Sequence, residues 1–393
     1  MKILNIQPFD YYGSIQRRSL QVALKLREEG IQTVFCVPQA KTWDRLFSME
    51  AAKQGFKVYR LDAVRPVETI TDVYSLKIMI KWLTSFPKVF AQLYKISKRE
   101  QIQVIQINGL ICIQEVLAMC ILSRKKIIWV LISDMYPRFL IYLLLPIIRC
   151  VGKRVFVSRR LTRYYLGIKD DTVVYEPIDI SVFDPHKVDP LVRQNLIEKF
   201  GLNKNTYLIV SVGNITPRKG FHYLIKAFAI VKRNFSNVKL LIIGDIFPHQ
   251  MKYYYELKKL VKSLNLDDDV IFTGYIDHQE LLTALSLADV FVIASLHEGT
   301  PVSILEAMAM ERPVVATNVG GVSEQVISWH TGILVPPKNP EAIAKAIIYL
   351  LQNSNERIKM QKKARMWVKK MFSLEKCALM YKKLYEDVFN NFK

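Results

Sequence analysis

Cysteine is scarce in this sequence, and its few positions form no recognisable pattern. The 393 residues include five cysteines, an odd number without a Cys-x-x-Cys pair: Cys36, Cys112, Cys120, Cys150 and Cys377. A disulfide framework needs paired cysteines, and a structural zinc site needs closely spaced ones. We therefore expect neither.

Long apolar runs are also missing. A helix that spans a bilayer needs about 20 apolar residues, and the strongest candidate, residues 139–148 between Arg138 and Arg149, is shorter than that. The sequence leaves two interpretations of this segment open: it docks on a bilayer surface, or it is a helix buried in the first domain. Residues 1–6 read as a first strand and not as a signal peptide.

Acidic residues are outnumbered by basic ones. The chain has 56 Lys and Arg against 35 Asp and Glu, which gives a net charge of +21 spread over both halves. A basic surface attracts anions in general, including nucleic acid, anionic lipid and nucleotide-bound sugars. Because no RNP, helix-turn-helix or zinc-finger pattern is present, a nucleic-acid partner is not expected.

Histidine is absent from the whole predicted first domain. The six histidines all lie beyond residue 184, at positions 186, 222, 249, 278, 297 and 330. A histidine base contributed by the first domain is therefore excluded. His297 stands beside the strongest motif of the sequence, but a lone histidine next to a motif is weak evidence for a role.

Signals for bound metal and for other well-known catalytic sites are also missing. No Ser/His/Asp triad or Walker A motif is present. Residues 267–269 match the letters Asp-x-Asp but precede a strand, so they are interpreted as a solvated turn. We expect no metal ion and no cofactor.

What the sequence does contain is a regular alternation of strands and helices in both halves. Such alternation is typical of parallel sheets covered by helices, and the length suits two domains of ordinary size. Residues 177–185 carry prolines, aspartates and a break in periodicity, which marks an interdomain link. We therefore predict an α/β fold with domains at residues 1–184 and 189–372, followed by an amphipathic helix from residue 373.

Individual elements can be read from the periodicity. Apolar runs predict strands at residues 3–6, 33–37, 104–107, 127–132, 155–157, 208–212, 239–243, 270–272, 290–293, 314–316 and 333–335. Residues 19–29 are predicted to be a helix that Gly30 ends. Residues 74–94 have a helical pattern that Pro87 interrupts.

Two glutamates eight positions apart, Glu298 and Glu306, are the most informative feature. The first follows an apolar strand in a loop, and the second lies about one turn into the next helix, so both carboxylates can line one pocket. Gly299 allows a ligand close to the backbone. Pro301 is predicted at the first helical position, where the free N–H groups and the helix dipole suit a phosphate or a sugar hydroxyl.

A second motif, SVGNITPRKG at residues 211–220, places two cations in a turn between a strand and a helix. Gly213 and Gly220 allow the backbone to approach a ligand. When a nucleotide sugar reacts, negative charge grows on the diphosphate, and fixed cations stabilise it there. Lys219 is the first candidate for this role, with Arg218 beside it.

These motifs resemble the retaining glycosyltransferases of family 4, also called glycosyl transferases group 1, over about residues 205–340. The segments LIIG, VIFTG, PVVATNVGG and TGILVP follow in that family's order, from residues 241, 270, 313 and 331. The resemblance implies the GT-B fold: two Rossmann-like domains facing a cleft, with a C-terminal helix (373–393) that packs back on the first. The first domain would bind the acceptor, and the second the nucleotide sugar.

The resemblance also implies roles for particular residues. Lys219 and Arg218 would bind the diphosphate, and Glu306 the donor ribose. Glu298 and the amides of Gly299, Thr300, Pro301 and Val302 would surround the transferred sugar, although proline contributes no N–H. The base would lie along Gly274, Tyr275 and Ile276; stacking on Tyr275 competes with simple packing at a strand end. Gly13 and Ser14 would cap the donor, and Arg17 and Arg18 would face anions or be solvated.

Two positions depart from the family pattern. Asn214 stands where relatives usually have an arginine that binds the diphosphate, and Arg218 is a candidate to compensate. Asn108 stands where many relatives have a histidine that touches the transferred sugar. Catalysis without that histidine is consistent with retaining transfer in which the leaving phosphate takes the acceptor proton on the same face, with Asn108 hydrogen-bonded to the sugar.

The sequence therefore predicts a cytoplasmic, metal-independent hexosyltransferase. A peripheral position at the inner face of the membrane is a further hypothesis, which rests on the basic charge and on residues 139–148. It would move a hexose or N-acetylhexosamine, UDP-linked rather than GDP-linked, to a hydroxyl of a glycan or lipid-linked acceptor. The alternatives are a GT-B nucleotide-sugar epimerase, a catalytically silent subunit that supports a partner transferase, and a basic nucleic-acid-binding protein. Turnover separates the transferase and the epimerase from the silent subunit. Salt-dependent binding of RNA or DNA would support the nucleic-acid-binding protein.

Overall fold

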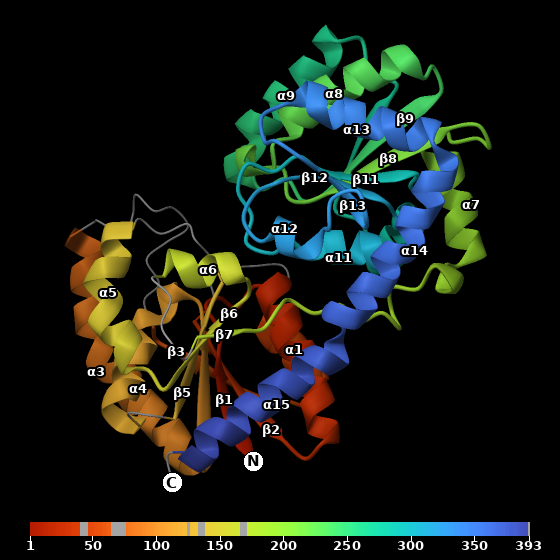
Figure 1. Cartoon of the computed structure of the whole chain (residues 1–393). Helices are drawn as coiled ribbons and strands as arrows, with labels where there is room; N and C mark the ends of the chain where they lie inside the picture. Colours follow the sequence, from red (N-terminus) through yellow and green to blue (C-terminus); the bar gives the residue numbers. More distant parts are fainter. Residues whose placement is uncertain (40–45, 64–75, 124–125, 133–137, 166–170, 392–393) are drawn as a thin grey trace. The chain divides into compact units, whose positions relative to one another are not determined.

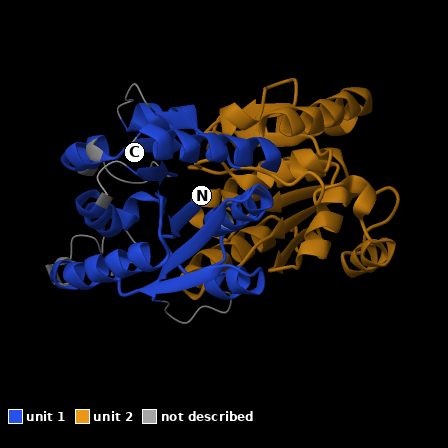
Figure 2. Cartoon of the chain, turned by 90° about the horizontal axis from the view of Figure 1, so that it is seen from below, with its two compact units in different colours: residues 1–176, 374–393 blue, residues 177–373 orange. Residues whose placement is uncertain are grey.

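The structure is a computed structural model that describes residues 1–39, 46–63, 76–123, 126–132, 138–165 and 171–391. The chain forms two compact units. Unit 1 comprises Met1–Glu176 and Leu374–Lys393, and unit 2 comprises Pro177–Ser373 (Figure 2). Each unit contains one parallel sheet covered by helices, which confirms the predicted α/β class.

Unit 1 has a seven-stranded parallel sheet in the order β3-β2-β1-β4-β5-β6-β7 (Figure 1). The strands are β1 (Lys2–Ile6), β2 (Gln32–Pro38), β3 (Lys57–Leu61), β4 (Val104–Asn108), β5 (Ile127–Leu131), β6 (Lys153–Phe156) and β7 (Thr172–Val173). The helices are α1 (Ser14–Glu28), α2 (Phe47–Lys53), α3 (Leu76–Arg99), α4 (Ile113–Ser123), α5 (Arg138–Cys150), α6 (Arg159–Tyr164) and α15 (Leu374–Asn391).

Unit 2 has a six-stranded parallel sheet in the order β10-β9-β8-β11-β12-β13. The strands are β8 (Tyr207–Val212), β9 (Val238–Ile243), β10 (Val270–Gly274), β11 (Val290–Ile293), β12 (Val314–Thr317) and β13 (Gly332–Val335). The helices are α7 (Pro190–Lys199), α8 (Phe221–Asn234), α9 (Met251–Ser263), α10 (His278–Leu287), α11 (Val302–Ala309), α12 (Val322–Gln325), α13 (Pro340–Gln352) and α14 (Ser354–Met371).

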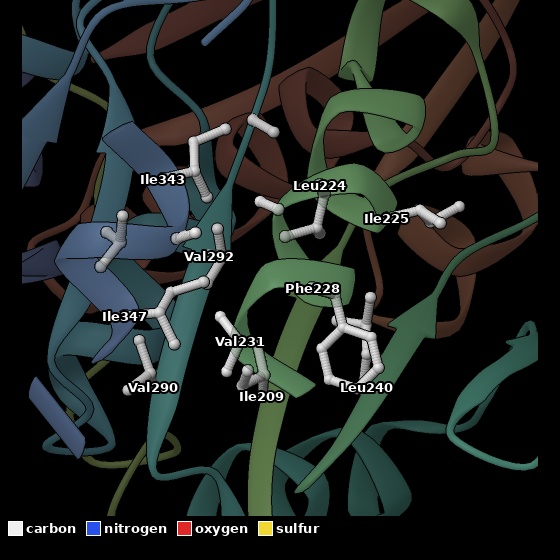
Figure 3. Packing of buried hydrophobic residues seen from close by; sticks show 14 of the residues in the cluster. Ile209, Leu224, Ile225, Phe228, Val231, Leu240, Val290, Val292, Ile343 and Ile347 are labelled. Atoms are coloured by element: carbon white, nitrogen blue, oxygen red, sulfur yellow. The ribbon is translucent and has the colours of Figure 1, made fainter. Parts of the chain in front are cut away.

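The core of unit 2 lies between its sheet and the helices α8 and α13. Phe228 and Val231 from α8 meet Ile347 from α13 and Ile209 and Val292 from the central strands (Figure 3). All five side chains are fully buried. The near-continuous apolar strands are those expected of a parallel sheet buried on both faces, and this core fixes the loops at the carboxyl ends of β8 and β11.

The C-terminal helix α15 packs on unit 1 beside α1, as predicted (Figure 1). The predicted apolar stripe is buried against the first sheet; it consists of Leu374, Cys377, Ala378, Tyr381, Leu384, Tyr385 and Val388. This stripe repeats every three or four residues, so one face of the helix is apolar and the other is solvated.

The expected interruption at Pro87 was wrong. Helix α3 runs through this proline from Leu76 to Arg99, and the preceding residues of the predicted helix lie outside the described residues. Pro87 is exposed. The carbonyl that a proline leaves without its helical partner can therefore bind water, which lowers the penalty for continuing the helix.

The apolar segment at residues 139–148 forms most of helix α5, which has two faces. Ile141 and Ile148 are buried in the core of unit 1, whereas Phe139, Tyr142 and Leu143 are 57–71% exposed. The helix is thus partly a core helix and partly an apolar surface. Among the described residues, no helix combines the length and apolarity needed to cross a membrane.

Candidate functional site

Two loops of unit 2 meet at the carboxyl ends of neighbouring strands. Strands β8 and β11 are adjacent in the sheet, so the segment after Val212 and the segment after Ile293 leave the same edge side by side. The backbone N–H of Leu296 donates to the carbonyl of Arg218 at 2.8 Å. The two sequence motifs, which are about 80 positions apart, therefore form one local structure.

Glu298 and Lys219 form the central ion pair of this structure. The Nζ of Lys219 lies 2.7 Å from Oε1 of Glu298, and Nη1 of Arg218 lies 3.4 Å from Oε2. The hydroxyl of Ser295 donates a further hydrogen bond to Oε1 at 2.7 Å. The carboxylate is 5% exposed, while the side chains of Lys219 and Arg218 are 14% and 40% exposed.

The electrostatics of Glu298 are set by these neighbours. Burial raises the pKa of this carboxyl, but the charges of Lys219 and Arg218 and the hydrogen bonds from Lys219 and Ser295 outweigh it, so the pKa lies below its ordinary value. The ion pair therefore contributes stability above the carboxyl's ordinary pKa and loses it as the pH falls through the lowered one. At neutral pH, Glu298 is the anion that pairs with both cations.

Glycines allow the loops to come this close. Gly220 has a φ of 65°, and a Cβ there would lie 2.1 Å from the carbonyl oxygen of Ala294. Gly320, in the turn after β12, has a φ of 53°, and its Cβ would lie 1.5 Å from the carbonyl oxygen of Glu298. Only glycine fits both the conformation and the space at these positions.

Helix α11 carries the second glutamate. Pro301 precedes the helix as its N-cap, with an extended backbone at φ −67° and ψ 118°, and Val302 is the first helical residue. The prediction that Pro301 is the first helical residue was therefore wrong by one position, because the extended ψ of Pro301 is not helical. Glu306 is 5% exposed, one turn into the helix.

The sugar-binding prediction concerns the chain between Glu298 and α11. Gly299 and Thr300 are partly exposed. The carbonyl of Gly299 accepts a hydrogen bond from the N–H of Gly321 at 2.6 Å, and the side-chain amide of Gln325 donates to the carbonyl of Pro301 at 3.2 Å. These bonds hold the carbonyls of Gly299 and Pro301 in place. They therefore fix the segment to which the predicted sugar contacts are assigned.

The predicted base-binding segment lies at the end of β10, two strands from β8. Backbone hydrogen bonds connect the three strand ends: Gly213 N–H to Ile243 O at 2.8 Å, and Gly244 N–H to Gly274 O at 3.1 Å. Tyr275 is 49% exposed and Ile276 is buried. The Tyr275 ring is therefore not a packed core side chain.

The first-domain candidates are arranged differently from the donor-site candidates. Asn108 ends β4 with a fully buried side chain. Its amide nitrogen donates to Asn5 Oδ1 at 2.8 Å and to Ile6 O at 2.9 Å, and its oxygen accepts from Gln106 at 2.9 Å and from Arg18 at 3.3 Å. Both donors and both acceptor positions are occupied, so this arrangement leaves none for a sugar.

Arg18 was expected to face an anionic ligand or solvent, and that expectation was wrong. The guanidinium is 3% exposed and forms an ion pair with Glu176 at 2.6 Å. Burial would lower the pKa of Arg18, but the carboxylate of Glu176 outweighs it, and the pKa rises. The predicted capping residues Gly13 and Ser14 lie at the start of α1, where Gly13 is the N-cap.

Several residues of the site were not predicted. Ser295 holds the Glu298 carboxylate, and Thr317 holds Ser295 by donating to its carbonyl at 2.6 Å. Ser295 is the first residue of the glutamate motif, so the sequence showed that it lies near Glu298. The sequence did not show that its hydroxyl donates to the Glu298 carboxylate. His297 is exposed and contributes its carbonyl, which accepts from Arg218 at 3.2 Å; this finding gives its ring no role.

Within the described part of the chain, no three His, Cys, Asp or Glu side chains are grouped so that they would hold a metal ion. Independence from metal stays a prediction.

The two loops of the site lie in a segment that matches a known family. Residues 192–367 match the family model described as glycosyl transferases group 1. This part of the chain is a glycosyl transferases group 1 domain. It contains both loops of the candidate site.

Curated relatives agree with this domain. The chain is 34% identical over 172 residues to an alpha-D-kanosaminyltransferase of Streptomyces kanamyceticus, covering 44% of this chain and 43% of that protein. It is 29% identical over 225 residues to an N-acetyl-alpha-D-glucosaminyl L-malate synthase of Bacillus anthracis, covering 57% and 56%. The chain thus spans about half the length of these curated relatives.

Solved structures show the fold over the whole chain. A glycosyltransferase from Rickettsia africae superposes with a TM-score of 0.81 at 21% identity, covering 99% of both chains. Anabaena Alr3699/HepE, solved in complex with UDP, superposes with a TM-score of 0.82 at 18% identity, covering 98% of this chain and 100% of that one. The group 1 domain therefore belongs to a chain with the GT-B fold, as predicted.

The close approach at Gly320 generates a stability prediction. Gly320→Ala must move the backbone of Glu298, whereas Gly274→Ala at a similar φ of 68° meets no atom within 4 Å. We expect Gly274→Ala to lower the free energy of unfolding by about 1–2 kcal/mol through its conformation alone. Gly320→Ala should lower it by about 1–3 kcal/mol more through the clash.

Urea unfolding of both variants beside the wild type measures this difference. Equal losses for the two glycines would contradict the close approach of the Gly320 turn to the Glu298 loop.

Proposed function

We propose that this protein is a retaining glycosyltransferase that transfers a hexose or N-acetylhexosamine from a nucleotide diphosphate sugar, UDP-linked rather than GDP-linked. The acceptor is a hydroxyl of a glycan or a lipid-linked glycan. The observation that carries the proposal is the Lys219–Glu298–Arg218 cluster at the strand ends of a group 1 domain. It combines the cations that a diphosphate needs with a carboxylate suited to sugar hydroxyls.

The cluster suits the leaving group through an exchange of partners. Without donor, Glu298 is the counter-ion of Lys219 and Arg218. A bound diphosphate offers these cations more negative charge, and the charge increases as the anomeric bond breaks. The cations then move toward the phosphates, and the Glu298 carboxylate becomes available to accept hydrogen bonds from hydroxyls of the transferred sugar.

We assign the rest of the donor along the strand order of unit 2. The sugar lies near Glu298 and the start of α11, and the ribose lies near Glu306. The base extends toward the end of β10, where the half-exposed ring of Tyr275 offers a stacking surface. Asn214 provides no cation, so Arg218, the more exposed of the two cations, supplies the second positive charge at the diphosphate.

The proton of the acceptor hydroxyl needs no histidine in this scheme. The bond from the anomeric carbon to the phosphate oxygen breaks, and the acceptor oxygen bonds to the same face of that carbon. The leaving diphosphate takes the acceptor proton, so charge and atoms balance without a protein base. This order is compatible with a predicted first domain that lacks histidine and with a fully hydrogen-bonded Asn108.

A silent GT-B subunit is the second candidate function. Asn214 in place of a cation and the fully occupied amide of Asn108 favour it, because both reduce the contacts available to a donor. Slow hydrolysis of a nucleotide sugar or transfer to an acceptor separates the two candidates, since a silent subunit does neither.

Lys219→Ala tests the leaving-group assignment. We expect turnover to fall about 10²–10³-fold, the range for removal of one group that stabilises developing charge. Lys226→Ala, an exposed lysine on the helix that follows, is the matched control and should retain wild-type turnover. The readout is release of nucleotide diphosphate in the presence of EDTA. Wild-type turnover in Lys219→Ala would remove Lys219 from the site.

Glu306→Ala tests the ribose assignment. A hydrogen bond to a charged group contributes about 1.5–3 kcal/mol, so the Kd of the donor should rise by about 10- to 100-fold. A donor titration by calorimetry gives this value directly. An unchanged Kd would show that Glu306 faces no part of the donor.

We also propose that the enzyme works at the inner face of a membrane, in surface polysaccharide or glycolipid assembly, with the exposed face of α5 on the bilayer. Phe139, Tyr142 and Leu143 are exposed on one helix of a strongly basic protein, and such faces bind anionic interfaces.

Leu143→Asn should weaken binding to anionic vesicles at low salt several-fold. Leu191→Asn, on the exposed surface of α7, should not. A protein that stays in solution with anionic vesicles contradicts this assignment.

A further inference from the structure

Trp329 is a large, exposed side chain in a backbone conformation that such residues avoid. Its φ is 60°, in the left-handed region, where a side chain meets the neighbouring carbonyl at a cost of about 1–2 kcal/mol. The residue is nevertheless 61% exposed. Burial of the ring in the core of unit 2 therefore does not explain why a tryptophan stands in this conformation, and exposed strain of this kind points to a function.

The loop that carries Trp329 is held firmly. The N–H of Trp329 donates to Gly332 O at 2.7 Å, and Thr331 bonds to Ile327 through both its N–H and its hydroxyl, each at 2.9 Å. The indole also contacts the ring of Tyr349 edge-on, with centroids 5.1 Å apart. The side chain is thus presented to solvent in a fixed position, with little ordering left for a binding event.

Helix α14 lies against the same loop and adds positive charge. The Nζ of Lys363 is 3.5 Å from Nδ1 of His330, and the indole N–H of Trp367 donates to Gln325 O at 2.9 Å. Met366 lies between these two contacts along the helix and is 70% exposed. We call Ile327, Trp329, Lys362, Lys363 and Met366 the Trp329 patch; all five are exposed.

The charge of α14 is strongly one-sided. Its 18 residues include seven Lys and Arg and one acidic residue, Glu356. That glutamate pairs with Lys359, one turn before Lys363. The lysines of the Trp329 patch therefore have almost no competing acid on their own helix.

We propose that the Trp329 patch binds the surface of an anionic lipid bilayer. The indole, Met366 and Ile327 enter the boundary between headgroups and acyl chains, while Lys362 and Lys363 bind lipid phosphates. Tryptophan ringed by lysine is the composition of membrane-interface surfaces. Protein–protein interfaces are instead depleted in lysine, so an acidic protein is the less suitable partner. This site lies on unit 2 and does not depend on the glycosyl-transfer chemistry.

The test is flotation of the purified full chain with two kinds of vesicle at low salt. One kind mixes phosphatidylglycerol with phosphatidylcholine, and the other contains phosphatidylcholine alone. The wild type should float only with the first. Trp329→Asn should bind several-fold more weakly, yet its Tm should be equal or higher, because asparagine tolerates the left-handed conformation. Lys363→Gln should weaken binding about fivefold, the effect of one basic residue near an anionic surface.

Matched controls come from α9 of the same unit. Tyr255 is 57% exposed among lysines, and Lys259 is exposed beside it, so Tyr255→Asn and Lys259→Gln make the same changes of ring and charge elsewhere. Neither should alter flotation. Brominated lipid should also quench the fluorescence of the wild type more than that of Trp329→Asn.

Three results overturn the proposal. The first is Trp329→Asn binding like the wild type, which would assign any membrane contact to another surface such as α5. The second is an equal loss in the α9 controls, which would show unspecific attraction of a basic protein. The third is a wild type that binds neither kind of vesicle, which would leave an acidic protein as the partner that the patch fits.

Discussion

The arrangement of the candidate site depends on one ion pair, between Lys219 and Glu298. Two loops that are far apart in the sequence carry positive and negative charge to the same point above the sheet of unit 2, where the carboxylate is almost completely buried. A buried carboxylate without partners would be strongly destabilising. Lys219, Arg218 and Ser295 together remove that penalty. The same contacts gather the two cations to which we assign the donor diphosphate.

Unit 1 uses its buried polar residues differently. Arg18, Asn108 and Glu176 bring α1, the end of β4 and the last residue of the unit's first segment into one hydrogen-bonded network. Asn108 is therefore a residue that positions its neighbours, and its amide is occupied by them. The charged cluster of Lys219, Arg218 and Glu298 lies in the group 1 domain. This location agrees with the proposed transfer, in which the substrate's own phosphate takes the proton.

Much of the fold was predictable because its signals are local. Apolar runs identified every strand of unit 2 and five strands of unit 1, and the stripe on α15 repeats within one helix. Strands β3 and β7 were missed, because β3 is mostly not buried and β7 has only two residues. The Glu298 and Lys219 motifs were found for a similar reason: each follows an apolar strand, and parallel strands bring such loops to one edge. Ser295 lies inside the motif, but only the structure shows that its hydroxyl supports the carboxylate.

The remaining features depend on contacts that are distant in sequence or on backbone conformation. Arg18 and Glu176 are 158 positions apart, so no spacing rule pairs them, and an arginine near a glycine was reasonably expected to face an anion. The path of α3 through Pro87 depends on that residue's exposure. Trp329 was not singled out at all, since a positive φ at a tryptophan has no sequence signal.

The central claim is that Lys219 and Arg218 exchange Glu298 for the diphosphate of a donor. The most direct measurement is calorimetric titration of UDP, GDP and their sugars, with EDTA present, into the wild type and Glu298→Gln. The claim predicts that one nucleotide binds selectively. It also predicts that Glu298→Gln binds the free nucleotide more tightly, because the competing carboxylate is gone, but gains little from the attached sugar. A nucleotide affinity that is unchanged or weaker in Glu298→Gln, or absence of binding by both proteins, would contradict it.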